Sequence, residues 1–66
     1  MLVYVNGRQQ EVPEGSTVAD LINLLEVQPR RIAVERNRQL VRRAAFADTS
    51  LAPEDRIEIV TLVGGG

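Results

Sequence analysis

The sequence predicts an α+β fold, in which a mixed sheet of four or five strands carries one main helix on one face. Two short runs of strand-forming residues flank Asn6-Gly7 near the start of the chain. One apolar stripe at the helical period follows them. The last apolar segment, Arg56 to Val63, is too apolar for an edge strand, so we expect it in the middle of the sheet.

The first element is predicted to be a β-hairpin. Leu2 to Val5 is apolar and rich in β-branched or aromatic residues, and Arg8 to Val12 follows the Asn6-Gly7 pair. An Asn-Gly pair between two such runs is the strongest short-range signal for a hairpin. Pro13 to Ser16 is turn material that leads out of it.

The main helix is predicted to begin after Thr17. Thr17 can cap a helix, and Asp20, three residues later, places a carboxylate in the first turn. Four apolar residues then share one helix face at positions i, i+3, i+4 and i+7: Val18, Leu21, Ile22 and Leu25. This stripe should pack against the sheet, and Pro29 marks the helix as finished.

The middle of the chain is predicted to form a second pair of short strands. Ile32 to Glu35 and Gln39 to Val41 flank a turn at Asn37-Arg38. Arg42 to Ser50 shows no clear periodicity, so we expect a loop with at most one helical turn, in which Phe46 closes the end of the core.

The last strand is predicted to run from Arg56 to Val63, and we interpret it as buried. Pro53 presets the backbone of the turn before it. Two strands, a helix and further strands, with the two terminal strands side by side in the middle, describe a β-grasp, or ubiquitin-like, architecture. We expect one domain over residues 1–63, followed by a flexible glycine tail over residues 64–66.

The composition argues against several classes of function. A chain of 66 residues hides only about 60% of the surface that it exposes when unfolded, which leaves little room for an enzyme cleft. The net charge of −1 gives no electrostatic attraction to nucleic acid or to an anionic membrane. Cysteine and histidine are absent, which speaks against a metal site, a bound cofactor or a nucleophilic triad. No membrane span or signal peptide is visible, so we expect a cytoplasmic protein.

The carboxyl-terminal glycines are the candidate functional group. Glycine has no Cβ, so Gly64, Gly65 and Gly66 can lie in a channel too narrow for side chains. Fully extended, they reach on the order of 10 Å beyond the fold. The alternative interpretation is an unstructured chain end, which is common at termini.

A terminal carboxylate needs activation before it can react. Its pKa is about 3.3 to 3.7, so it is an anion at neutral pH and resists nucleophiles. Transfer of an adenylyl group from ATP would activate it, and a partner enzyme would have to do this, because the chain has no P-loop and no lysine. A sulfur nucleophile would then leave a thiocarboxylate, whereas a lysine amine would leave an isopeptide bond. Because all eight basic residues are arginine, side-chain conjugation of this chain to itself is ruled out.

The sequence resembles the ThiS group of sulfur carrier proteins of thiamin biosynthesis, within the set that includes the small subunit of molybdopterin synthase. The resemblance covers essentially the whole chain. It is carried by Val5-Asn6-Gly7, Glu14 to Leu21, Arg31 to Asn37, Asp55 to Val60 and Val63 to Gly66.

The resemblance implies a function for the glycine end. Gly66 would be adenylated by an E1-like adenylyltransferase of the ThiF type and converted to a thiocarboxylate, while Gly64 and Gly65 thread into the partner's active site. The sulfur would come from cysteine through a donor such as a cysteine desulfurase and go to a thiazole synthase of the ThiG type. Two positions depart from the family: Glu54 stands where glycine is common, and Arg42-Arg43 where proline or neutral residues are expected.

A partner must also grip the body of the protein. If Ile57 and Ile59 face the core, then Glu58, Val60 and Leu62 face outward beside Tyr4 and Leu2 of the first strand, which would make a docking patch. The alternative is that the chain's own loop, including Phe46, covers this face. Four arginines could pair with acidic partners, but we interpret them as a solvated basic edge: Arg30, Arg31, Arg42 and Arg43.

Three other functions remain open at this point. The carrier could deliver sulfur to molybdopterin or another metabolite, or the chain could be a ubiquitin-like protein modifier that uses the same activation. It could also be a binding module, because Val12 to Leu25 looks like the TGS type of β-grasp domain.

Overall fold

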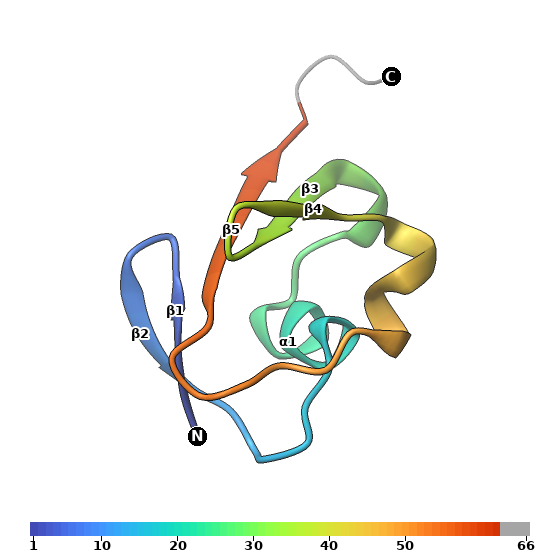
Figure 1. The fold of residues 1–66 in the computed structure, drawn as a ribbon. Helices are drawn as coiled ribbons and strands as arrows, with labels where there is room; N and C mark the ends of the chain where they lie inside the picture. Colours follow the sequence, from blue (N-terminus) through green and yellow to red (C-terminus); the bar gives the residue numbers. More distant parts are fainter. Residues whose placement is uncertain (63–66) are drawn as a thin grey trace.

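The computed structural model describes residues 1–62, which form a five-stranded mixed sheet with one α-helix against one face (Figure 1). The strands lie in the order β2-β1-β5-β3-β4. In chain order the elements are β1 (Leu2–Val5), β2 (Arg8–Glu11), α1 (Val18–Leu25), β3 (Ile32–Arg36), β4 (Gln39–Val41) and β5 (Arg56–Thr61). Two short 3₁₀ helices complete the order, at Pro29–Arg31 and Arg43–Asp48.

The two terminal strands are neighbours at the centre of the sheet, as the sequence predicts. β1 and β5 run parallel, with Val5 beside Ile57. The other pairs are antiparallel: β1 with β2 across the Asn6-Gly7 turn, β3 with β4, and β3 with β5. The predicted β-grasp architecture is confirmed, and β5 is flanked by strands on both sides.

The helix begins and ends where its local signals indicate. The Asp20 amide donates to the Thr17 hydroxyl at 3.2 Å, and the Thr17 amide donates to the Asp20 carboxylate at 2.8 Å, which completes a capping box. The helix ends at Leu25, and Glu26 follows in a left-handed conformation with φ 58°. Pro29 lies in the next element, as expected.

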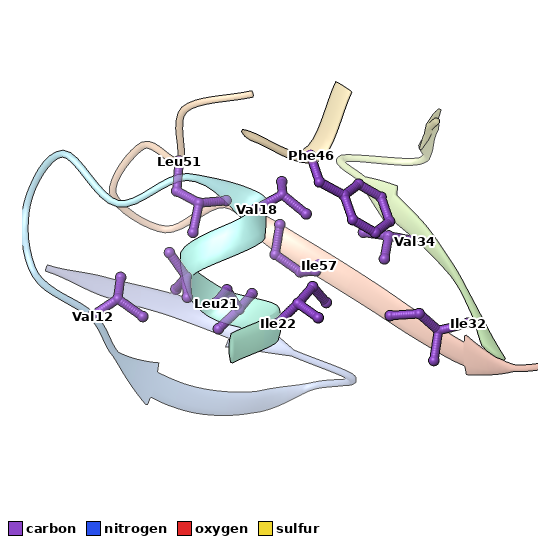
Figure 2. Packing of buried hydrophobic residues seen from close by; sticks show 10 residues of the cluster. Val12, Val18, Leu21, Ile22, Ile32, Val34, Phe46, Leu51 and Ile57 are labelled. Atoms are coloured by element: carbon purple, nitrogen blue, oxygen red, sulfur yellow. The ribbon is translucent and has the colours of Figure 1, made fainter. Parts of the chain in front are cut away.

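The hydrophobic core lies between α1 and one face of the sheet (Figure 2). Of the predicted helical stripe, Leu25 is only partly buried. Phe46 enters the core from the 3₁₀ helix Arg43–Asp48, as predicted, although that helix is longer than the single turn expected. The buried hydrophobic residues are Val3, Val12, Val18, Leu21, Ile22, Ile32, Val34, Phe46, Leu51 and Ile57.

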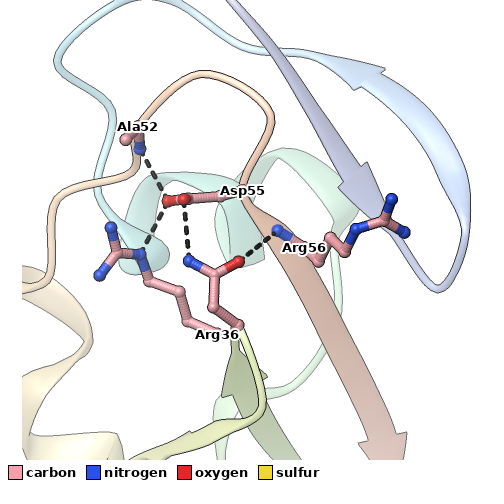
Figure 3. A network of polar contacts seen from close by, with 5 residues as sticks. Arg36, Ala52, Asp55 and Arg56 are labelled. Carbon is pink, nitrogen blue, oxygen red and sulfur yellow. Dashed lines mark hydrogen bonds and ion pairs between the residues drawn. The ribbon is translucent and has the colours of Figure 1, made fainter.

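A polar network joins the start of β5 to β3 (Figure 3). The buried Asp55 carboxylate accepts hydrogen bonds from Arg36 Nε at 2.7 Å, from the Asn37 side-chain Nδ2 at 3.0 Å and from the Ala52 backbone N–H at 2.8 Å. Burial by itself raises the pKa of Asp55, but these hydrogen bonds and the guanidinium charge of Arg36 outweigh it and hold the pKa below its ordinary value.

The last strand corrects the sequence interpretation in two respects. β5 ends at Thr61, whereas the prediction continued it to Val63. Val63 and the predicted boundary between the domain and the glycine tail lie outside the described residues. The strand is also not buried throughout: Ile57 is 1% exposed, but Val60 is 58% exposed. Among residues 1–62 the core covers only one face of the sheet, so Val60 and Leu62 on the other face are exposed.

Candidate functional site

The predicted reactive end, Gly64, Gly65 and Gly66, lies outside the described residues. The structure instead defines the strand that leads to it. β5 lies in the middle of the sheet, and Leu62 is the last described residue after it. The site is therefore built from β5 and the residues that hold or surround its carboxyl-terminal half.

On one side, β3 holds β5 along its whole length. The antiparallel register pairs Arg36 with Ile57 at one end and Ile32 with Thr61 at the other. One further bond continues the same register, because the Leu62 amide donates to the Arg31 carbonyl at 2.7 Å. The strand is thus fixed on this side as far as the described chain extends.

On the other side, the β1 backbone reaches only the first half of β5. The Asn6 amide, just beyond β1, donates to the Ile57 carbonyl at 2.8 Å. The Asn6 side chain then continues the contact: its Oδ1 accepts from the Ile59 amide at 2.8 Å, and its Nδ2 donates to the Ile59 carbonyl at 3.2 Å. Sequence reasoning treated Asn6 only as a turn residue and missed this role.

The predicted docking residues share the open face of the sheet. The register places Tyr4 beside Arg56 on this face, and strand alternation places Glu58, Val60 and Leu62 there too. Val60 is 58% and Leu62 51% exposed. Tyr4 is partly buried, and the Arg56 guanidinium carbon lies 5.5 Å from the centre of its ring, within cation–π range.

The loop containing Phe46 does not cover this face. Phe46 lies in the core on the helix side of the sheet, so the alternative raised from the sequence is wrong (Figure 2). Leu40 of β4 adds to the exposed apolar surface at 68% exposure. The register places Leu40 next to Glu35, which in turn lies beside Glu58. Leu40 was missed because the sequence gives no pairing register for so short a strand.

Two acidic side chains, Glu35 and Glu58, lie beside the exposed apolar residues of the open face, and Arg56 lies on the same face at the start of β5. Glu35 and Glu58 are directly opposite each other on neighbouring strands, both exposed, and neither forms an ion pair within residues 1–62. Like charges in this arrangement are unfavourable in the free protein. The predicted basic edge is exposed and likewise forms no ion pair in this part of the chain: Arg30, Arg31, Arg42 and Arg43.

Two kinds of feature are absent from the described residues. Across residues 1–62, no group of three acidic, histidine or cysteine side chains is arranged to hold a metal ion. Within the same range, no helix has the length and apolarity needed to cross a membrane.

Comparisons with known proteins agree with this architecture. The model of the ThiS family matches residues 3–66. A thiazole synthase of Paramagnetospirillum magneticum is 35% identical over 66 residues, which are 100% of this chain but 20% of that protein. The sulfur carrier protein ThiS of Bacillus subtilis is 29% identical over 66 residues, covering 98% of this chain and 100% of that protein. The chain therefore spans about a fifth of the length of its thiazole synthase relative.

A solved structure is similar over the complete fold. The crystal structure of the thiamine biosynthesis protein ThiS from Geobacter metallireducens matches with a TM-score of 0.86 and 33% sequence identity, covering 100% of both chains. The likeness extends over the strand order and the helix, and it includes the strand that leads to the glycine end.

Proposed function

The chain belongs to the ThiS family, and from that premise we propose that it is a cytoplasmic sulfur carrier protein of thiamin biosynthesis. The observation that carries the proposal is the family match over residues 3–66, which includes the three glycines. In this role the chain is a substrate of partner enzymes and performs no catalysis itself.

The reacting group is the terminal carboxylate of Gly66. An E1-like adenylyltransferase of the ThiF type transfers AMP from ATP to this carboxylate and releases pyrophosphate. The persulfide that a desulfurase forms from cysteine then attacks the acyl carbon and expels AMP. A thiol cleaves the resulting acyl disulfide, which leaves the thiocarboxylate on Gly66 and a new disulfide between the thiol and the persulfide carrier. Gly64 and Gly65 bring this group into the partner's active site because they have no side chains to exclude them.

A thiazole synthase of the ThiG type is the proposed acceptor enzyme. Thiazole synthases from two organisms are each 35% identical to this chain over 66 residues, which favours thiazole over molybdopterin as the product. A role as a protein modifier is less favoured, because the similar proteins named above are thiazole synthases and ThiS proteins.

Intact-mass spectrometry tests the chemistry directly. The chain is incubated with ATP, a ThiF-type adenylyltransferase, a cysteine desulfurase, cysteine and a thiol reductant. We expect a product whose mass corresponds to replacement of one oxygen by sulfur, located at Gly66 by fragmentation, and no such product from a chain truncated after Gly64. Failure of the full chain to gain sulfur contradicts the proposal, and adducts on lysines of other proteins would favour the modifier.

We further propose that the open face of the sheet docks the adenylyltransferase. Its exposed apolar residues, Leu40, Val60 and Leu62, lie beside the carboxylates of Glu35 and Glu58, which form no ion pair with any residue from 1 to 62. A partner surface that combines apolar side chains with arginine or lysine complements this face, because it relieves the repulsion between the carboxylates as it buries the apolar area.

Val60→Asp and Leu24→Asp form a matched pair for testing this face. Both residues are more than half exposed, at 58% and 52%, but Leu24 lies on α1, on the opposite side of the sheet. We expect Val60→Asp to weaken binding of the adenylyltransferase by about 10-fold or more and Leu24→Asp by less than about 2-fold. Calorimetric titration measures both, and equal affinities for the two variants contradict docking at this face.

A further inference from the structure

Two asparagines in the hairpin turns hold β5 from opposite sides. Asn6 follows β1 and Asn37 follows β3, and each has a left-handed backbone with φ 51°. Each side chain makes two hydrogen bonds. The Asn37 side chain bonds to the Arg56 backbone N–H and to the Asp55 carboxylate, at the start of β5. The Asn6 side chain makes both of its bonds to the backbone of Ile59, near the end of β5.

The side-chain amide of Asn6 takes the place of a peptide group in the sheet. The bond from Leu62 to Arg31 shows that the even-numbered residues at the end of β5 direct their backbone groups toward β3. The odd-numbered residues therefore direct theirs toward β1. β1 ends at Val5, so at Ile59 the Asn6 side chain supplies both the acceptor and the donor that a further strand residue would supply.

Asn6 is the last partner that β5 has on this side among residues 1–62. No backbone bond joins Thr61 to β1, to β2 or to the turn between them within that range. Beyond Ile59 the strand is held by β3 alone. A strand paired on both edges has a fixed direction, whereas one paired on a single edge can twist about that edge.

We infer that Asn6 is a positioning residue for the carboxyl-terminal end. Its side chain extends the two-sided part of the sheet to Ile59 and thereby sets the direction in which Val60, Thr61 and Leu62 leave the body. The inference rests on the proposed function, because it concerns how the terminus is aimed at the adenylating centre. Small misplacements of a reacting group cost up to about 100-fold in rate, so loss of this contact should lower the rate of the chemical step more than the affinity of docking.

Asn6→Gly and Asn37→Gly provide a matched comparison. Glycine accepts the left-handed backbone at both positions, and each change removes two side-chain hydrogen bonds, near the end of β5 for Asn6 and at its start for Asn37. Both variants should unfold at lower urea concentration than the wild type. Only Asn6→Gly should lower kcat for ATP-dependent adenylation, by about 10-fold with KM within about 2-fold, because the docking face is unchanged.

An independent measurement reports on the strand itself. Residual dipolar couplings of the Thr61 and Leu62 amides measure the direction of the strand end relative to the body. They should change in Asn6→Gly and stay as in the wild type in Asn37→Gly. Asn6→Asp keeps the acceptor for the Ile59 amide but loses the donor, so its kcat should lie between those of Asn6→Gly and the wild type.

The outcomes separate this inference from the proposed function. If the wild-type chain is not adenylated at all, the proposed function fails and the inference fails with it. If the wild type is adenylated but Asn6→Gly keeps its kcat, or loses no more than Asn37→Gly, only the positioning role of Asn6 is overturned. All rates are taken under conditions where circular dichroism shows each variant to be folded.

Discussion

Replacing Asp55 by alanine should remove a large part of the stability of this small domain. The buried carboxylate accepts three hydrogen bonds, of which one comes from the Ala52 backbone and two from side chains of β3 and its turn. At about 1 kcal/mol net for each bond, Asp55→Ala should cost about 3 kcal/mol. A domain of this length has a free energy of unfolding of only about 3 to 10 kcal/mol, so the change is easy to measure.

The loss should depend on pH in a defined direction. The hydrogen bonds and the Arg36 charge hold the pKa of Asp55 in the folded protein below its ordinary value of 3.8. In the interval between the two values the unfolded chain binds more protons, so stability rises with pH there. The contribution of Asp55 is therefore fully present above about pH 4 and is lost as the pH falls through the lowered pKa.

Urea unfolding followed by circular dichroism, from pH 7 down to pH 2.5, measures both effects. Asp48→Ala is the control, since Asp48 is an exposed carboxylate for which no hydrogen bond is seen within residues 1–62, and it should cost less than about 0.5 kcal/mol. The difference between the wild type and Asp55→Ala should shrink as the pH falls below about 4. A loss at pH 7 equal to that of the control, or one that stays constant to pH 2.5, would refute the reasoning.

Three further changes test local structure, each by urea unfolding at pH 7. Glu54 has a left-handed backbone with φ 67°, and glycine at this position relieves about 1 to 2 kcal/mol of strain. Glycine also gives the unfolded chain more freedom, which lowers stability by about 0.5 to 1 kcal/mol. Glu54→Gly should therefore stabilise the fold by roughly 0.5 to 1 kcal/mol. A lower midpoint would contradict this. Leu21 is 0% and Leu24 52% exposed on the same helix, so Leu21→Ala should cost about 2 to 5 kcal/mol and Leu24→Ala less than about 0.5 kcal/mol. Similar losses would mean that the core face of α1 is wrongly assigned. Thr17→Ala removes the helix cap and should cost about 1 kcal/mol, and no loss would show that the capping box is dispensable.

Features encoded by neighbouring residues were predictable from the sequence. The Asn6-Gly7 pair fixes a hairpin because the turn type depends on those two residues alone. Thr17 and Asp20 fix the start of α1 for the same reason, since both partners of the capping box lie within one helical turn. The order of such elements then leaves few ways to arrange the sheet, which is why the β-grasp architecture could be predicted.

Features that depend on register between distant segments were not predictable. The run from Arg56 to Val63 is apolar enough to be interpreted as a buried strand, but among residues 1–62 only α1 and the segment around Phe46 cover the sheet, and both lie on one side. Leu40 is exposed because it lies on the face of the sheet opposite α1 and the segment around Phe46. The contact between Asn6 and Ile59 joins residues 53 positions apart, so no local pattern could indicate it.

The one-sided core explains how so small a body can dock and still present its end. The helix and the 3₁₀ helix around Phe46 use one face of the sheet to form the core, and within residues 1–62 the apolar side chains at the end of β5 on the other face stay exposed. Val60 and Leu62 therefore remain more than half exposed immediately before the glycine end. Because only about half of each residue's surface is still exposed, each can contribute about 0.8 to 1.5 kcal/mol when a partner buries it, without any loss from the core. In the proposed function, docking and delivery depend on the same strand, and in the proposed role of Asn6 its side chain helps to set the direction of that strand. Changes at Val60 should therefore alter affinity, while changes at Asn6 should alter rate.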